Sequence, residues 1–281
     1  METFNTGELP TRRDRPARVL VDRYELVREI GQGSFATVFE GWDRLVGRVV
    51  ALKRLDVQVS DRSLRRELVA LRYARLRGVA EILDDFVDEG VSWVVLRLVV
   101  GTPFPGEDLG VWPSWEALEP RVLDALRVLG RLHRLGLAHQ DVKPRNMLVG
   151  VDGAVQLLDL GLATARWLRS SEGRGFEGTL RYAAPEQRRA LLVEGEASFD
   201  RTRADLYSLG ATVYEALAGT PPFADLHGKQ AWQALVVAEQ DPPLPSLASI
   251  RHDLPPRVVA WVEAMLAVDP ARRQIGRASV G

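Results

Sequence analysis

The spacing of apolar residues changes once along this chain of 281 residues, close to position 100. Before that point the chain holds short runs rich in β-branched and aromatic residues, namely 24–31, 36–43, 47–55, 81–88 and 91–99. One helical pattern, at 60–78, interrupts these runs. Beyond it, helical spacing predicts helices at 114–136, 203–219, 229–240 and 255–269. We therefore expect an α+β protein with a small antiparallel β lobe that holds one helix and a larger, mostly helical lobe.

The composition places boundaries around these two lobes. Residues 1–22 are polar and charged, and we expect them to form a flexible lead-in. The folded domain is predicted at 23–275, with its lobes at 23–99 and 100–275, and a short tail at 276–281. A cleft between two lobes is a common place for a binding site.

Charge and cysteine content narrow the class of protein. The formal net charge of −1 carries no electrostatic signature of a nucleic-acid partner. The chain has no cysteine, so disulfides and thiolate metal sites are excluded. The longest apolar run, 91–100, is broken by Arg97 and is too short to span a bilayer. We expect a cytoplasmic protein without a membrane segment.

The first glycine-rich stretch is IGQGSFATV at 30–38. Gly31 and Gly33 would let the backbone turn tightly and approach an anion closely. By itself the stretch fits an ordinary hairpin at least as well, because Ala36 replaces the third glycine of a G-x-G-x-x-G pattern. No helix is predicted after it, so neither a dinucleotide-binding fingerprint nor a Walker P-loop fits.

One lysine and one glutamate are predicted to lie in apolar surroundings. Lys53 lies inside the apolar run VALK, and an ion pair with Glu67 of the predicted helix would offset its burial. The alternative is a solvated lysine at a strand edge and a surface glutamate.

The stretch HQDVKPRN at 139–146 follows the long predicted helix and precedes a short strand pair. Asp141 could accept a proton, Lys143 could neutralise a phosphate and Asn146 could ligate a metal. Asp159 follows in VQLLDLG. Each of these residues alone fits a capped turn or a surface loop.

Taken together and in order, six motifs resemble the signature set of the protein kinase family. They are Gly31-x-Gly33-x-x-Ala36-x-Val38, Val50-Ala-Leu-Lys53, His139-Gln-Asp141-Val-Lys143-Pro-Arg-Asn146, Asp159-Leu-Gly161, Ala184-Pro-Glu186 and Asp205-x-Tyr-Ser-Leu-Gly210. The resemblance runs from about Tyr24 to about Arg273, and GTLRYAAPEQ at 178–187 is most similar to bacterial, eukaryotic-like Ser/Thr kinases.

The resemblance implies a bilobal kinase fold and a protein substrate with a Ser or Thr acceptor, with ATP and Mg²⁺ as cofactors. The implied catalytic residues are Asp141 as base, Lys143, Lys53 with its partner Glu67, and Thr179, which bonds Asp141 and Lys143. Asn146 and Asp159 are the implied metal ligands. The implied nucleotide contacts are Ile30, Gly31, Gln32, Gly33, Ser34, Phe35 and Ala36 over the phosphates, Val38, Ala51 and Leu148 around the adenine, Lys53 at the phosphates, Leu96 as gatekeeper, and Arg97 and Val99 in the hinge.

Lysine usage supports this resemblance independently. Lys and Arg together number 37, but only Lys53, Lys143 and Lys229 are lysines. Two of the three fall where the family needs a compact ammonium group rather than a planar guanidinium group.

The resemblance also implies contacts that support the site, and the sequence departs from the family pattern at some positions. The resemblance implies a buried Glu186–Arg273 ion pair and an Asp205 that braces the catalytic loop. Gln140 replaces the usual arginine before the catalytic aspartate, so we expect activity without phosphorylation of the activation loop. Leu160 replaces the phenylalanine of D-F-G, and we expect this change to cause little loss of activity. The alternatives are a pseudokinase that binds ATP as a scaffold and a small-molecule phosphotransferase on a related fold.

Overall fold

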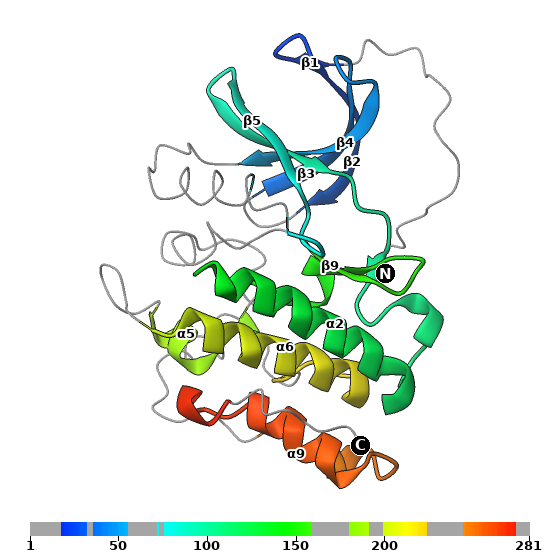
Figure 1. Ribbon diagram of the computed structural model, residues 1–281, viewed down its shortest axis with the longest axis vertical. Coiled ribbons are helices and arrows are strands. Elements are labelled where there is room, and N and C mark those ends of the chain that lie inside the picture. The colour runs from blue at the N-terminus through cyan, green and yellow to red at the C-terminus, as the bar shows by residue number, and fades with distance from the viewer. Residues whose placement is uncertain are drawn as a thin grey trace. The chain divides into compact units, whose positions relative to one another are not determined.

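The computed structural model describes residues 18–32, 36–55, 72, 76–158, 180–190, 199–223 and 244–273. The chain divides into two compact units, Met1–Thr102 and Pro103–Gly281. Figure 1 shows that strands make up the described part of the first unit and that helices dominate the second. The expected α+β class, with a β lobe followed by a helical lobe, is confirmed.

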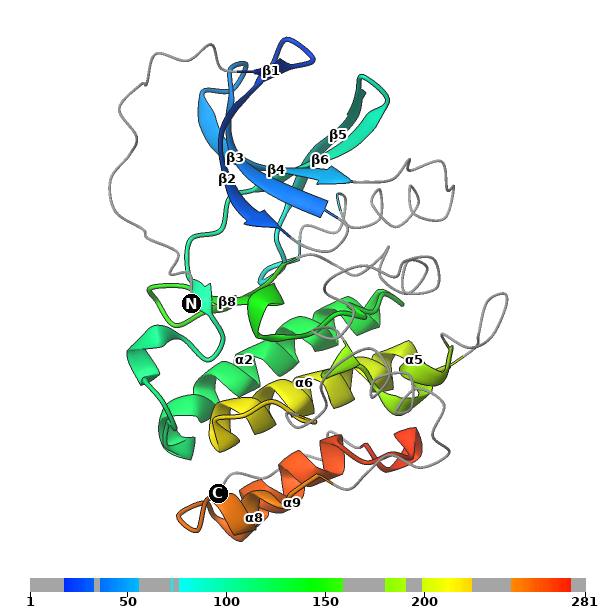
Figure 2. The ribbon, with the colours of Figure 1, turned by 180° about the vertical axis from the view of Figure 1, so that it is seen from behind.

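The first unit is built on a six-stranded sheet with the order β1-β2-β3-β4-β6-β5, in which every neighbouring pair is antiparallel. Its strands are β1 (Val19–Leu20), β2 (Tyr24–Gln32), β3 (Ala36–Asp43), β4 (Arg48–Leu55), β5 (Ile82–Asp88) and β6 (Val91–Arg97). The sheet is strongly curved (Figure 2). Five of these strands match the predicted runs to within two residues.

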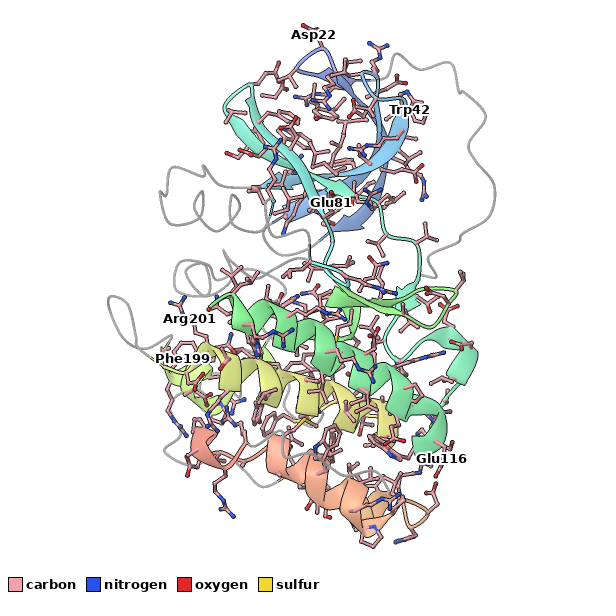
Figure 3. The ribbon with its side chains drawn as sticks, viewed as in Figure 1. Asp22, Trp42, Glu81, Glu116, Phe199 and Arg201 are labelled. Atoms are coloured by element: carbon pink, nitrogen blue, oxygen red, sulfur yellow. The ribbon has the colours of Figure 1, made fainter. Side chains whose placement is uncertain are left out.

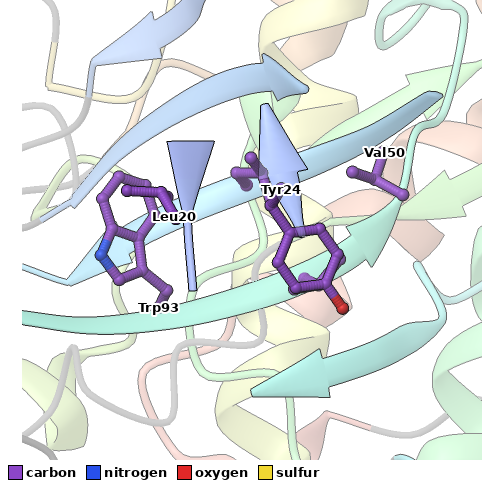
Figure 4. Close-up of a cluster of buried hydrophobic side chains, with 6 residues drawn as sticks. Leu20, Tyr24, Val50 and Trp93 are labelled. Carbon is purple, nitrogen blue, oxygen red and sulfur yellow. The ribbon is translucent and has the colours of Figure 1, made fainter. Parts of the chain in front are cut away.

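One face of this sheet carries the core of the first unit. The buried cluster, shown in Figure 4, consists of Leu20, Tyr24, Val50, Leu52, Trp93 and Val95. Phe86 adds aromatic contacts to it, with its ring centroid 5.1 Å from that of Tyr24 and 6.2 Å from that of Trp93. This packing leaves no room at Gly41, where a Cβ atom would lie 2.4 Å from Leu52 Cδ1.

Strand β1 lies within the segment expected to be a flexible lead-in. Val19 and Leu20 pair with Glu25 and Tyr24, and Leu20 is completely buried in the core cluster. Packed structure therefore begins at least three residues before position 23. A run of two apolar residues is too short to show strand periodicity, so the sequence alone did not reveal this strand.

The second unit is organised around three helices, α2 (Trp115–Arg134), α6 (Arg201–Ala218) and α9 (Pro256–Met265). They lie side by side in Figures 1 and 2. Shorter elements complete it: the helices α5 (Pro185–Arg189) and α8 (Leu247–Ile250), the 3₁₀ turns η1 (Glu107–Leu109), η2 (Pro144–Asn146) and η4 (Pro270–Arg272), and the strands β7 (Thr102–Pro103), β8 (Met147–Val149) and β9 (Val155–Leu157). The β8–β9 pair confirms the strand pair expected after the HQDVKPRN stretch.

Residue spacing and capping explain the helices that frame the site. Helix α2 begins after the Ser114 cap, and its buried residues Leu118, Val122, Ala125, Leu129 and Leu132 recur at three- and four-residue steps. Helix α6 begins after the Asp200 cap and ends at Gly219, whose φ of 74° is left-handed. The observed helices start and end within four residues of the predicted bounds. The helix predicted at 229–240 and most of that at 60–78 lie outside the described residues.

The ion pair expected between Glu186 and Arg273 is present. The two Arg273 Nη atoms lie 2.5 and 2.8 Å from the two Glu186 carboxylate oxygens, and the Arg273 side chain is fully buried. Because these residues lie 87 positions apart, the pair ties α5 to the end of the described domain. In the part of the chain that the structure describes, no helix has both the length and the apolarity to cross a membrane.

Candidate active site

A buried carboxylate organises the turn that holds Asp141. Asp205 on α6 has no exposed surface. Its Oδ2 atom accepts the His139 backbone N–H at 2.7 Å and bonds His133 Nε2 at 2.8 Å, and its Oδ1 atom accepts the Gln140 backbone N–H at 2.7 Å. Three donors from two segments thus converge on one carboxylate, which fixes the backbone just before Asp141. The expected bracing role of Asp205 is confirmed.

Gln140 has a left-handed backbone, with φ of 65°. Side-chain-bearing residues adopt this region at an energetic cost, so the surroundings must hold it in place. They do so from both sides, because Asp205 accepts the Gln140 N–H and Gln187 Nε2 donates to the Gln140 carbonyl at 2.8 Å. The Gln140 side chain is buried, and its Oε1 atom has no hydrogen-bond partner among the described residues.

His139 connects this turn to the end of β9. Its ring atom Nε2 lies 2.8 Å from the Leu158 carbonyl, and its Nδ1 accepts the Asp141 backbone N–H at 3.3 Å. A carbonyl only accepts, so Nε2 is the donor of this bond. Leu158 also donates its N–H to the Asn146 carbonyl at 2.8 Å. The residue immediately before Asp159 is therefore anchored to the same turn.

The side chains of Asp141, Lys143 and Asn146 meet at one oxygen. Lys143 Nζ and Asn146 Nδ2 each lie 2.8 Å from Asp141 Oδ2, and Nδ2 also donates to the Asp141 carbonyl at 2.8 Å. The Asp141 side chain is 9% exposed. Two donors hold this buried carboxylate in one orientation. The structure confirms that these three sequence-predicted residues form one cluster.

In the first unit, strand register gathers the other predicted residues on one face. Lys53 lies directly opposite Val38 and Val94, and Ala51 lies opposite Leu96. Directly opposed residues in antiparallel strands project to the same face, and so do residues two apart. Val38, Ala51, Lys53 and Leu96 therefore share a face, and the alternating Val50 and Leu52 carry the core on the other. Lys53 and Leu96 are half-buried.

Comparison with known proteins decides the family. The family model described as "Protein kinase domain" matches residues 24–277. This chain belongs to the protein kinase family. The match covers both units, including the strand face with Lys53 and the Asp141 cluster.

Several similar proteins are bacterial serine/threonine kinases. The probable serine/threonine-protein kinase PknA2 of Bifidobacterium longum is 29% identical over 90% of this chain and 33% of its own length. The serine/threonine-protein kinase PknL of Mycobacterium tuberculosis is 32% identical over 98% of this chain and 68% of its own length. A probable serine/threonine-protein kinase of Corynebacterium efficiens is 30% identical over 92% of this chain and 40% of its own length. The chain thus spans a third of PknA2 and about two thirds of PknL.

The remaining predicted site residues of this kinase domain divide into two groups. Ile30, Gly31 and Gln32 end β2, Ala36 begins β3, Arg97 ends β6, Val99 follows it, and Leu148 lies half-buried in β8. Gly33, Ser34, Phe35, Glu67, Asp159 and Thr179 lie outside the described residues. The same holds for Leu160.

Two supports of the turn were missed from the sequence. His133 belongs to none of the six motifs, but it bonds Asp205. Gln187 follows Glu186 in the A-P-E motif and donates to Gln140, 47 positions earlier. Neither residue has a local sequence signal of its own. The one indirect signal is that His133 lies at the end of a helix, six positions before His139, and the loop after this helix leads into the turn.

A second pair missed from the sequence lies beside the turn. The Tyr182 hydroxyl donates to Glu215 Oε2 at 2.5 Å. Burial, followed by the neighbouring Glu215 charge, raises the pKa of Tyr182 far above its ordinary value. Burial also raises the pKa of Glu215, and the bond from Tyr182 partly offsets this rise. The pair joins the segment before α5 to α6.

Proposed function

We propose that this chain is an active, ATP- and magnesium-dependent serine/threonine protein kinase, which transfers the γ-phosphate of ATP to a Ser or Thr hydroxyl of a protein substrate. The convergence of Lys143 Nζ and Asn146 Nδ2 on Asp141 Oδ2 carries this proposal. Phosphoryl transfer depends on positioned groups and on charge stabilisation, and this cluster supplies a fixed carboxylate with an ammonium group beside it.

Asp141 is assigned as the residue that accepts the proton of the substrate hydroxyl. Its orientation is set by Lys143 and Asn146, and its backbone by the bond to His139. Lys143 Nζ lies close enough to Asp141 to share the space beside a transferred phosphate, where a compact ammonium group fits better than a guanidinium plane. Thr179 is assigned a hydroxyl bond to these two residues.

The donor set fits magnesium. Both hydrogen bonds of the Asn146 side-chain amide nitrogen go to Asp141. The side-chain oxygen Oδ1 of Asn146 is therefore the atom left to ligate a cation. Amide and carboxylate oxygens are the ligands that Mg²⁺ takes in proteins, and Asp159 is assigned as the carboxylate ligand. When bound, magnesium neutralises the negative charge that develops on the phosphates.

The nucleotide is assigned to the strand face of the first unit. Lys53 is assigned to the α- and β-phosphates, with Glu67 as its partner, and the stretch 30–36 to the remaining phosphate contacts. Val38, Ala51 and Leu148 are assigned to the adenine, and Leu96, Arg97 and Val99 to the hinge. The shared face of Val38, Ala51, Lys53 and Leu96 supports this assignment.

Transfer of labelled γ-phosphate from ATP with magnesium to the chain itself and to a basic protein tests the proposal. The Asp141→Asn variant keeps the size of the side chain and removes the proton acceptor, so we expect loss of labelled phosphoserine and phosphothreonine. Asp152→Asn is the matched control, because Asp152 lies in an exposed turn and accepts only a local N–H. An inactive wild-type chain that ATP still stabilises against heat would instead indicate a pseudokinase.

We also propose that activity does not depend on phosphorylation of the activation loop. The buried Gln140 carries no charge, and its Oε1 atom is an acceptor, so the side chain offers no cation for a phosphate. Changing Thr164, Ser170 and Ser171 together to alanine should leave most of the activity. A triple variant that loses most of its phosphotransfer while remaining folded would refute this point.

A further inference from the structure

A pocket of about 380 Å³ in the first unit has a strongly polar lining. Its lining residues are Arg48, Arg72, Glu81, Ile82, Leu83 and Arg97. Glu81, labelled in Figure 3, lies immediately before β5, and Arg48 and Arg97 come from the adjacent ends of β4 and β6. Three arginines and one glutamate give these lining residues a net formal charge of +2.

The two strand arginines of the pocket project to the opposite face of the sheet from the proposed nucleotide contacts. Arg97 is directly opposite Val50, and Arg48 precedes Val50 by two residues, so both arginines project to the face that holds the hydrophobic core. Leu96, assigned to the nucleotide, projects to the other face. The side chains of Arg48 and Arg97 therefore point away from the strand face assigned to the nucleotide, although Arg97 belongs to the hinge segment by its backbone.

One nitrogen of Arg48 is buried without a hydrogen-bond partner. This nitrogen is Nε, and no described residue forms an ion pair with Arg48. A buried donor that is left unpaired destabilises a protein by about 1–3 kcal/mol, and more when the group is charged. The Nε atom of Arg48 therefore lacks an acceptor among the described residues.

The other two arginines differ in how firmly they are held. Arg97 donates from Nε and Nη2 to Glu81 Oε2 at 2.8 and 2.6 Å, so Glu81 neutralises it. Arg72 lies 3.5 Å from Asp84 and 3.7 Å from Asp85, beyond good hydrogen-bond distance, and its side chain is 44% exposed. Asp84 also receives closer bonds from Arg23 and Tyr24. Arg72 can therefore turn toward a ligand and lose only weak interactions with Asp84 and Asp85.

We propose that this pocket binds a phosphate group, with Arg48 as the principal donor and Arg72 as the second. Guanidinium groups match phosphate oxygens with paired, charge-assisted hydrogen bonds. The phosphate can be inorganic or carried on a protein side chain, since both present the same oxygens. This site does not depend on the proposed kinase activity.

Calorimetric titration of inorganic phosphate into the full chain tests the site. The active site is first saturated with a non-hydrolysable ATP analogue and magnesium, and chloride keeps the ionic strength constant. We expect saturable binding that weakens at least tenfold in Arg48→Gln and several-fold in Arg72→Gln. Arg44→Gln is the matched control, because Arg44 lies in the turn just before Arg48 but outside the pocket, and the affinity of this variant should equal that of the wild type.

Equal phosphate affinity of the wild type and Arg48→Gln, or no saturable binding by the wild type, would overturn the proposal. If Arg48→Gln does not fold, the Arg72→Gln titration decides, since that side chain is largely solvated. Acetate titrated in place of phosphate should bind at least tenfold more weakly, and equal binding would exclude a phosphate site. A phosphoserine peptide that binds more tightly than inorganic phosphate, and in the same Arg48-dependent way, would identify a protein-borne phosphate as the ligand.

Discussion

Asp205 holds Gln140 in a left-handed backbone conformation, through a hydrogen bond of 2.7 Å from the Gln140 N–H to Asp205 Oδ1. The two residues lie 65 positions apart, so only the folded helical unit brings them together. The position of Asp141 follows from this bond, because Gln140 is its immediate neighbour.

Asp205→Asn should both destabilise the domain and reduce its activity. An asparagine side chain would place an NH₂ group against one of the three donors that now converge on the carboxylate. Buried hydrogen bonds to charged groups contribute about 1.5–3 kcal/mol each, so we expect a loss of at least about 2 kcal/mol in urea unfolding. The kcat for phosphotransfer should fall at least tenfold. Thr212→Val is the control, since it removes a buried hydroxyl from the same helix at a distance from the turn.

Gln187→Met should lower kcat with little change in the KM for ATP. The substitution keeps the length of the side chain but removes the donor that satisfies the Gln140 carbonyl. An unsatisfied buried carbonyl destabilises by about 1–3 kcal/mol, and here the turn can relieve it by moving. We expect a three- to tenfold fall in kcat. If Gln187→Met loses only stability, as Thr212→Val should, then Gln187 does not position the turn.

Lys143→Arg should impair phosphotransfer although it keeps the charge. The guanidinium group is larger and planar, and it would compete with Asn146 Nδ2 for Asp141 Oδ2. We expect at least a tenfold loss of kcat, with a Tm close to that of the wild type because the side chain is partly exposed. Lys229→Arg, at the third lysine of the chain, should leave activity unchanged. An active Lys143→Arg variant would show that charge alone suffices at this position.

The Glu186–Arg273 pair should show strong coupling in a double-mutant cycle. Removing one partner of a buried ion pair destabilises by about 3–5 kcal/mol, because the other charge stays buried. Arg273→Met and Glu186→Met should each be strongly destabilising, and the double variant should lose much less than their sum. The exposed Arg18–Glu89 pair, at 2.8 Å, is the control and should couple by less than about 1 kcal/mol. Additive losses at Glu186 and Arg273 would contradict this expectation.

Acid should destabilise the first unit through Asp43. The hydrogen bonds from Arg23, at 2.8 and 2.9 Å, hold the pKa of Asp43 below its usual value. Because the folded-state pKa is the lower one, this stabilisation is complete above the unfolded pKa, near 4, and is lost as the pH falls below it. Asp43→Asn should therefore destabilise at pH 7 by about 1–3 kcal/mol, and the difference from the wild type should shrink toward pH 3.

Urea unfolding at several pH values measures this effect. Glu89→Gln serves as the control, since Glu89 is exposed and should change stability little at any pH. A constant difference between Asp43→Asn and the wild type from pH 7 to pH 3 would show that the Arg23–Asp43 pair does not cause the acid sensitivity.

Local sequence patterns predicted most elements of the fold. Alternating apolar residues and turn residues fixed β2 to β6, and the periodic spacing of Leu118, Val122 and Leu129 fixed α2. These signals work because each element satisfies its own backbone hydrogen bonds with near neighbours and buries one face. The two-residue strand β1 was missed for the same reason, since it has no period of its own and depends on Tyr24 and Trp93 for its burial.

The sequence by itself determined which residues of the Asp141 cluster come together, because Asp141, Lys143 and Asn146 lie within one turn of six residues. It also determined the shared face of Ala51 and Lys53, which follows from their alternation along one strand. Only the tertiary structure decided what holds the cluster, namely the His133 and Asp205 bond and the Gln187 bond to Gln140. The same is true of the unpartnered Nε atom of Arg48 in the first unit. These depend on segments tens of residues apart, and a buried polar group finds its partner, or lacks one, only when the chain packs around it.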